Sequence, residues 1–228
     1  DLREAGNKPI LSNEVLVEAN ESMRMPSLSG CQTLMDDNSG ENDGTSVNLP
    51  DWFLRNNRSR DATAQCTLVG ISYKEFGRKM LSSWIDPFRE ALCDNSDEPT
   101  LRGRYSVATL SINEGRVLSW LSGFIRKSAK SNTPPQLHGE SLLYFGEDPS
   151  EFRDALRMHN TLTGYVYLLD GIGRVRWAGS GVATEAEAMD MVGFAKELVP
   201  GGVRQTAKQI PSSKKERRSA LTRRKGRG

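Results

Sequence analysis

Hydrophobic and polar positions change their spacing several times along the middle of the chain, and these changes predict a series of strands and helices. Short apolar runs between turn-forming residues, as in CTLVGIS at 66–72, are typical of strands buried on both faces. Stretches in which apolar residues recur every three or four positions predict helices with one apolar face. The predicted strands are 66–72, 104–112, 142–146, 164–170 and 174–179, and the predicted helices are 72–93, 114–129, 151–158 and 184–199.

Local signals indicate where two of these helices begin. Ser72 and Glu75 have the spacing of a capping box, in which each side chain bonds a free backbone amide at the start of a helix. Thr184 and Glu187 repeat this spacing at the last helix. Pro87 is expected to kink or interrupt the first helix, because proline fits only the first turn of a helix. The helix at 114–129 has one apolar face, formed by Val117, Leu118, Leu121, Phe124 and Ile125.

The order of these elements predicts the fold class. Strands that alternate with helices and then end in a hairpin and a helix are typical of an α/β sandwich of the thioredoxin-like kind, with a central mixed sheet. We expect this domain at 61–202, between an acidic, largely irregular N-terminal arm at 1–60 and a basic tail at 203–228. Within the arm, LPDWF at 49–53 predicts a short anchor whose Trp52 and Phe53 pack on the domain or on a partner.

Charge is distributed unevenly along the chain. The 228 residues have a mean hydropathy of −0.55 and a net charge of +2. Residues 1–50 carry three basic and nine acidic residues, whereas residues 203–228 carry ten basic residues and one acid. No apolar run approaches the roughly 20 residues that span a bilayer. The chain does not begin with methionine, which indicates either a mature form after removal of a targeting peptide or an engineered chain.

The basic tail is the strongest electrostatic feature of the sequence. Such a tail is typical of segments that contact RNA phosphates or an anionic, cardiolipin-rich membrane, and it also fits a plain solvated tail. It has no aromatic residue, so base stacking is not indicated. The candidate contacts are Lys214, Lys215, Arg217, Arg218, Arg223, Arg224, Lys225 and Arg227.

The glycine-rich bend GSGVAT at 179–184 has the position of a phosphate-binding loop, between a strand and a helix. However, Thr184 stands where the dinucleotide fingerprint needs its third glycine. Glu185 and Glu187 follow in the first helical turn and would repel phosphate. A serine nucleophile at Ser180 also fits poorly, because Ala178 stands where the nucleophile motif needs glycine. The sequence therefore favours a tight corner over a nucleotide site.

Other catalytic chemistries find no matching residues. The segment after the first core strand, SYKEFGRKM, contains no cysteine, although redox proteins with this fold place their reactive thiol there. Three distant cysteines and two distant histidines form no metal set. Asp148, Glu151 and Asp154 are explained by the helix that they begin. We therefore expect no enzyme activity, no cofactor, no metal site and no small-molecule substrate.

The hairpin segment NTLTGYVYLLDGIGRVRWAGSGVATEAE at 160–187 resembles the signature of a family of mitochondrial ATP synthase Fo assembly factors, the ATPase-complex "subunit ten" proteins. LVGISYKEFGRKMLSSWIDPF at 68–88 resembles the first strand and helix of the same family. The resemblance covers roughly 66–200. The matching hairpin residues are Asn160, Gly164, Tyr165, Asp170, Gly173, Arg174, Arg176, Trp177, Gly179, Ser180, Gly181, Ala183 and Thr184.

This resemblance implies a thioredoxin-like mitochondrial protein, in the matrix or associated with the inner membrane, that acts as a chaperone for Fo subunit 6 during its assembly with the ring. It also implies a set of candidate contacts with a partner protein. We expect the Trp177 side chain to pack inward and the two arginines to stay on the other face, either open to a partner or paired with Asp170. The candidate partner contacts are Trp84, Tyr165, Arg174, Arg176 and Trp177.

The acidic arm and the basic tail are not part of the family pattern. They favour an alternative in which a relative of these factors serves in the assembly or structure of the mitochondrial ribosome, with the tail on rRNA. The partners are then ribosomal proteins rather than Fo subunits.

Overall fold

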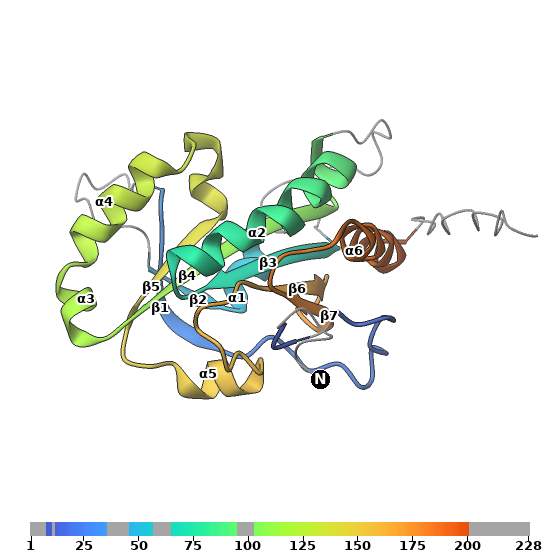
Figure 1. The fold of residues 1–228 in the computed structure, drawn as a ribbon, viewed down its shortest axis with the longest axis horizontal. Helices are drawn as coiled ribbons and strands as arrows, with labels where there is room; N and C mark the ends of the chain where they lie inside the picture. The colour runs from blue at the N-terminus through green and yellow to red at the C-terminus, as the bar shows by residue number, and fades with distance from the viewer. Residues whose placement is uncertain (1–7, 11, 36–45, 57–64, 95–102, 201–228) are drawn as a thin grey trace, which may run out of the picture.

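The structure is a computed structural model that describes residues 8–10, 12–35, 46–56, 65–94 and 103–200. Its centre is one mixed sheet of seven strands in the order β2-β1-β5-β4-β3-β6-β7 (Figure 1). The strands are β1 (Leu28–Thr33), β2 (Ser46–Leu49), β3 (Cys66–Ser72), β4 (Tyr105–Glu114), β5 (Ser141–Gly146), β6 (Tyr165–Asp170) and β7 (Val175–Ser180).

Helices lie on both faces of this sheet (Figure 1). They are α1 (Asp51–Asn56), α2 (Glu75–Phe88), the π-helix η1 (Arg89–Asp94), α3 (Arg116–Trp120), α4 (Ser122–Asn132), the 3-10 helix η3 (Pro135–Glu140), α5 (Ser150–Ala155) and α6 (Glu185–Leu198).

The core of the sheet has thioredoxin-like topology. β3 and β4 are parallel, β6 pairs with β3 in the antiparallel direction, and β7 closes the hairpin with β6. β5 then extends the sheet in parallel beside β4, and the antiparallel pair β1–β2 extends it further. The thioredoxin-like α/β fold predicted from the element order is confirmed.

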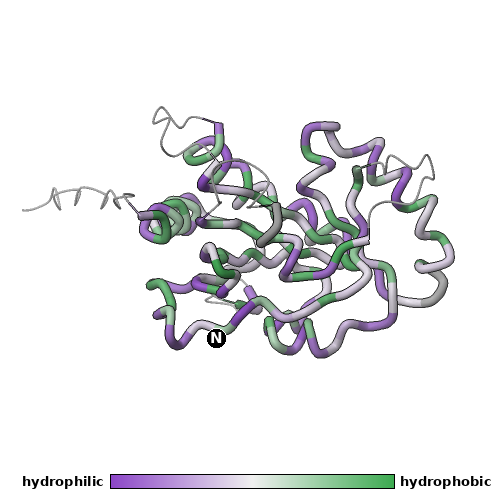
Figure 2. Tube along the Cα trace, turned by 180° about the vertical axis from the view of Figure 1, so that it is seen from behind, coloured by the Kyte–Doolittle hydropathy of each residue, from purple (hydrophilic) through white to green (hydrophobic). Residues whose placement is uncertain are grey.

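Two hydrophobic clusters hold the layers together. On one face, Leu68, Val107 and Trp177 pack beneath α2 and α6. On the other face, Ile71 and Leu110 belong to a cluster that includes residues of α1 and α5. Every residue of β3 is buried, which explains why its sequence is apolar without alternation. Figure 2 shows hydrophobic positions along much of the central strands.

The N-terminal region corrects one expectation. The described part of residues 1–60, predicted to be largely irregular, contributes β1, β2 and α1, and Met25, Leu34 and Phe53 are buried in the core or at its edge. β1 shows no clean alternation because its register shifts between Leu28 and Cys31, where Gly30 has a φ of 79°. A period-two search therefore misses it. The predicted anchor at Trp52 and Phe53 packs on the domain itself.

The helix boundaries differ from the sequence prediction at several places, and the single helix predicted at 114–129 is divided into α3 and α4. Ser72 is the last residue of β3, and α2 begins at Glu75 after Lys74, without a side-chain cap, so the first capping box is wrong. α2 also continues through Pro87, and the chain then widens into the π-helix η1. The capping box of Thr184 and Glu187 is confirmed.

Candidate functional site

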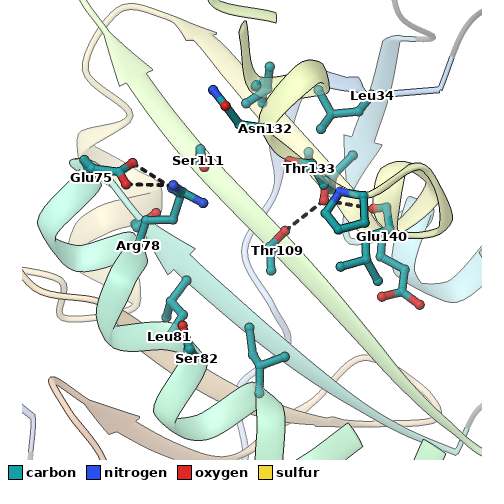
Figure 3. A pocket seen from close by; sticks show the side chains of 18 of the residues that line it. Leu34, Glu75, Arg78, Leu81, Ser82, Thr109, Ser111, Asn132, Thr133 and Glu140 are labelled. Atoms are coloured by element: carbon teal, nitrogen blue, oxygen red, sulfur yellow. Dashed lines mark hydrogen bonds and ion pairs between the residues drawn. The ribbon is translucent and has the colours of Figure 1, made fainter. Parts of the chain in front are cut away.

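A groove of about 730 Å³ separates α2 from α4 on one face of the sheet. Figure 3 shows Glu75 and Arg78 of α2 on one side, Asn132 and Thr133 at the end of α4 on the other, and β4 between them. The groove reaches the carboxyl ends of β3 and β4, which is where open α/β sheets commonly bind their ligands.

The floor of the groove is polar because β4 changes character along one face. Its side chains on this face begin with Tyr105 and Val107, which are buried in the apolar cluster. They continue as Thr109, Ser111 and Asn113, which line the groove (Figure 3). Thr109, Ser111 and Asn113 are only partly buried, so their hydroxyl and amide groups remain accessible from the groove.

Ion pairs border the groove along α2. Arg78 donates two hydrogen bonds of 2.7 Å to the Glu75 carboxylate, and these bonds lower the pKa of Glu75. Further along, Arg89 of η1 pairs with Glu140 of η3. Both pairs place neutralised, hydrogen-bonding groups beside apolar wall residues such as Leu81 and Ile125. This mixed surface suits an extended or helical peptide segment better than a small anion.

The aromatic residues of the resemblance lie in the core rather than on a surface. Trp84, Tyr165 and Trp177 are each at most 1% exposed. The Trp84 and Trp177 rings meet edge to face with centroids 5.5 Å apart, and Trp84 Nε1 donates to the Gly181 carbonyl at 2.8 Å. These three side chains cannot contact a partner in this conformation, which corrects their assignment as candidate contacts. Inward packing of Trp177 is confirmed.

The two hairpin arginines are half-buried and engaged within the chain. The Arg176 guanidinium donates to the Val17 carbonyl at 2.7 Å and lies 3.6 Å from the Asp170 carboxylate. Arg174 forms a β-bridge with Arg24, and its amide donates to Asp170 at 2.9 Å. The predicted alternative, in which an arginine pairs with Asp170, is therefore what Arg176 shows. A role for either arginine in contacting a partner stays a proposal.

The chain's own N-terminal segment, residues 8–25, covers the outer edge of β7. The amides of Asn13, Val17 and Met25 donate to the carbonyls of Ala178, Arg176 and Gly173 at 2.8–3.2 Å. The Trp177 indole donates to the Asn13 carbonyl at 2.8 Å. An unpaired edge strand is a template for aggregation, and this segment occupies it. The sequence signal was absent, because the segment forms no regular strand.

Lys8 and Ile10, near the start of this segment, contact the glycine-rich bend and the helix after it. Ser180 Oγ donates to the Ile10 carbonyl at 2.6 Å, and the Ile10 amide is 3.0 Å from the same oxygen. Lys8 pairs with Glu187 and lies 5.4 Å from the Trp84 ring centroid. The position that a phosphate would occupy is thus next to a lysine already bound to a carboxylate. The bend is a tight corner, as the sequence favours.

Glu187 is the most strongly perturbed carboxylate of the bend. Partial burial alone would raise its pKa, but hydrogen bonds from Lys8, Thr184 and Ser12 lower the pKa to about 2. Glu187 thus remains ionised at neutral pH while it caps α6 and holds the N-terminal segment.

The three cysteines form no pair, and each is a free thiol. Burial raises the pKa of Cys31 to about 12 and that of Cys93 to about 11, and it raises the pKa of Cys66 further. A thiol with a raised pKa is a poor nucleophile at neutral pH. Among the described residues no group of three or more His, Cys, Asp or Glu side chains is arranged to hold a metal.

Two other predictions concern membranes and nucleic acid. Within the described ranges, no helix has both the length and the apolarity needed to cross a bilayer. The tail candidates, Lys214, Lys215, Arg217, Arg218, Arg223, Arg224, Lys225 and Arg227, lie outside the described residues. Their contact with RNA or lipid stays a prediction, as does the boundary of the basic tail at 203.

Comparisons with known proteins give one family and several structural likenesses. The family model described as "ATP10 protein" matches residues 1–198. No curated protein sequence gives a significant match. Similar solved structures include a DsbF homologue from Corynebacterium diphtheriae, with 13% identity over 82% of this chain and 91% of that chain and a TM-score of 0.44.

Two further structures resemble the chain to the same degree. BsSco, a member of the Sco family of cytochrome c oxidase assembly proteins, has 14% identity over 78% of this chain and 94% of that chain, with a TM-score of 0.46. A secreted thiol-disulfide isomerase from Corynebacterium glutamicum has 15% identity over 82% of this chain and 91% of that chain, with a TM-score of 0.47. Because these scores lie below 0.5, the fold assignment rests on the order and direction of the strands.

Proposed function

The chain belongs to the ATP10 protein family, and from that premise we propose that it assists assembly of the mitochondrial ATP synthase Fo sector by holding subunit 6 before it joins the ring. The family is mitochondrial and consists of ATP synthase assembly factors. The observation that carries the proposal is the extent of the match, which runs from residue 1 to 198 and includes the sheet, the hairpin and both walls of the groove.

The groove between α2 and α4 supports the proposal as the place where a client segment binds. Its polar floor offers hydrogen-bonding groups, and its walls offer apolar side chains such as Leu81 and Ile125. A client segment that is partly apolar and partly polar satisfies both. The hairpin edge is a weaker choice, because residues 8–25 already use its backbone groups.

The experiment that tests this proposal is site-specific photo-cross-linking in mitochondria. A photoreactive amino acid replaces Ser82 on α2 or Ser128 on α4, which are exposed residues on the two walls of the groove. The matched control replaces Asp154, an exposed residue of α5 on the opposite face of the sheet. We expect cross-links to newly made subunit 6 from the two groove positions and not from the control.

Two outcomes contradict the proposal. Equal cross-linking of Fo subunits from Asp154 and from the groove would exclude the groove as the client site. Capture of ribosomal proteins in place of Fo subunits, lost after RNase treatment, would instead support the ribosomal alternative, to which none of the comparisons points.

A further inference from the structure

The segment α3–α4 presents large apolar side chains to solvent. Trp120 is 85% exposed and Phe124 is 75% exposed, and Leu121 between them is 38% exposed. Of the other three tryptophans, Trp84 and Trp177 are at most 1% exposed and Trp52 is partly buried. Exposed aromatic groups of this size that gather on one helical element are uncommon in soluble proteins and mark an interaction surface.

The same segment carries positive charge without acidic residues. Residues 115–139 contain no Asp or Glu, and their basic residues are Arg116, Arg126, Lys127 and Lys130, of which Arg126 is buried. Lys127 is exposed beside the aromatic residues. Figure 2 shows hydrophilic and hydrophobic positions interspersed along α4. An amphipathic element with Trp, Phe and Leu together with Lys and Arg is typical of helices that lie in the interface of an anionic membrane.

Arg126 fixes the orientation of this element. Its side chain is 4% exposed, and it donates to the Thr33 carbonyl at 3.2 Å and to the Met35 carbonyl at 2.7 Å. This anchor ties α4 to the end of β1. Trp120, Leu121 and Phe124 nevertheless remain exposed to solvent, and Phe124 also lines the groove between α2 and α4.

We propose that α3–α4 is a peripheral membrane-binding element that places Trp120, Leu121 and Phe124 in the interface of an anionic lipid bilayer. The surface favours anionic lipid because Trp120 and Phe124 are exposed on the same segment as the exposed Lys127, a combination typical of helices at a membrane interface. The absence of acidic residues from 115–139 complements a negative lipid surface. α3 also lies at the opposite end of the molecule from α6 (Figure 1), so binding there leaves the hairpin free. The proposal does not rest on the identity of the client.

The test is vesicle co-flotation of the full chain with phosphatidylcholine vesicles, with and without cardiolipin. The double variant Trp120→Ser/Phe124→Ser is compared with Met189→Ser, which removes a 60% exposed side chain from α6. The basic tail also attracts anionic lipid, so binding is measured at high salt as well, where the Debye length falls to about 3 Å and tail attraction is screened. We expect the double variant to bind at least about tenfold more weakly at high salt, because two apolar contacts are lost.

A second readout reports insertion directly. Brominated lipid should quench the fluorescence of the full chain, and Trp120→Phe should bind vesicles normally but lose this quenching. Lys127→Glu should weaken binding to cardiolipin vesicles and leave folding intact.

Three results would overturn the proposal. One is binding by the double variant that equals that of Met189→Ser at high salt. Another is normal vesicle binding by the double variant together with loss of Fo-subunit capture, which would make α3–α4 a protein-docking surface. The third is a change in oligomeric state in the double variant without any change in lipid binding, which would assign the surface to a second copy of the chain.

Discussion

The two ends of the molecule use tryptophan in opposite ways. At the hairpin end, Trp177 is buried, packs against Trp84 and donates its indole hydrogen to Asn13. At the other end, Trp120 is almost fully exposed. The hairpin holds most of the residues by which the sequence resembles its family, yet the chain itself satisfies their hydrogen bonds. A recognisable motif can therefore specify the fold, while the available surface lies in a segment that has no motif.

The largest expected difference between the two ends is in stability. Trp177→Ala should reduce the free energy of unfolding by about 4 kcal/mol, since it leaves a cavity beneath α2 and α6 and removes the bond to Asn13. Trp120→Ala should change the same quantity by less than about 0.5 kcal/mol. Urea unfolding followed by circular dichroism measures both. Similar losses from the two variants would mean that α3–α4 packs against the body more extensively than its exposure indicates.

Alanine substitutions at Gly77 and Gly123 should change the stability of the protein in opposite directions. At Gly77 an added Cβ would lie 2.8 Å from the Thr163 backbone, where α2 meets the start of β6. Gly77→Ala should therefore destabilise the protein by about 2 kcal/mol, because the helix must move away. Around Gly123 in α4 there is no atom within 4 Å of the added Cβ, and Gly123→Ala should stabilise the protein by about 0.5 kcal/mol. Thermal unfolding of the two single variants gives the signs. Destabilisation by Gly123→Ala would show that α4 is not a regular helix at this position.

The smallest effect concerns the N-terminal segment and pH. The pKa of Glu187 is lowered from its usual 4.5 to about 2, so its contribution to the attachment of residues 8–25 is fully present above about pH 4.5 and is lost as the pH falls towards 2. Lys8→Ala should lower the free energy of local opening of this segment by about 1 kcal/mol, as expected for a partly exposed ion pair. Hydrogen exchange at the Asn13 and Val17 amides measures this opening.

A matched variant separates the ion pair from general acid effects. Glu187→Gln should remove most of the pH dependence of these two amides between about pH 4.5 and 2, because no carboxylate remains to be protonated. Unchanged pH dependence in Glu187→Gln would mean that another acidic residue of the segment causes the effect.

The sequence predicts the central elements well and the coverage of surfaces poorly. β3 is predictable because burial on both faces requires a continuous apolar run, and α6 because its capping box is local. The N-terminal segment pairs with β7 through irregular backbone contacts, which leave no period in the sequence. The period at 114–129 predicts one helix with Leu121 and Phe124 on its apolar face, whereas the structure divides this helix at Leu121 and leaves both side chains exposed. However, a period shows which residues share a face and not whether another element covers it.

The same limit explains why the sequence does not predict the groove between α2 and α4. The polar side chains Thr109, Ser111 and Asn113 alternate with apolar ones in β4, and such alternation is usual for a strand with one solvated face. That the solvated stretch lies between two helices, and so forms a groove, depends on where α4 is held. Arg126 holds α4 in place by donating hydrogen bonds to the carbonyl groups of Thr33 and Met35, which are 93 and 91 residues away in the sequence.

The attachment of residues 8–25 to the hairpin also has a consequence in time. The contact between Ile10 and Ser180 joins positions 170 residues apart, so Ile10 is synthesised well before its partner and can bind it only after nearly all of the sheet exists. Ile10 and Leu16 pack against the two hydrophobic clusters in the folded protein, so their side chains remain unpacked until those clusters have formed. An assembly factor thus has a maturation step of its own, in which residues 8–25 attach only after β7 has formed.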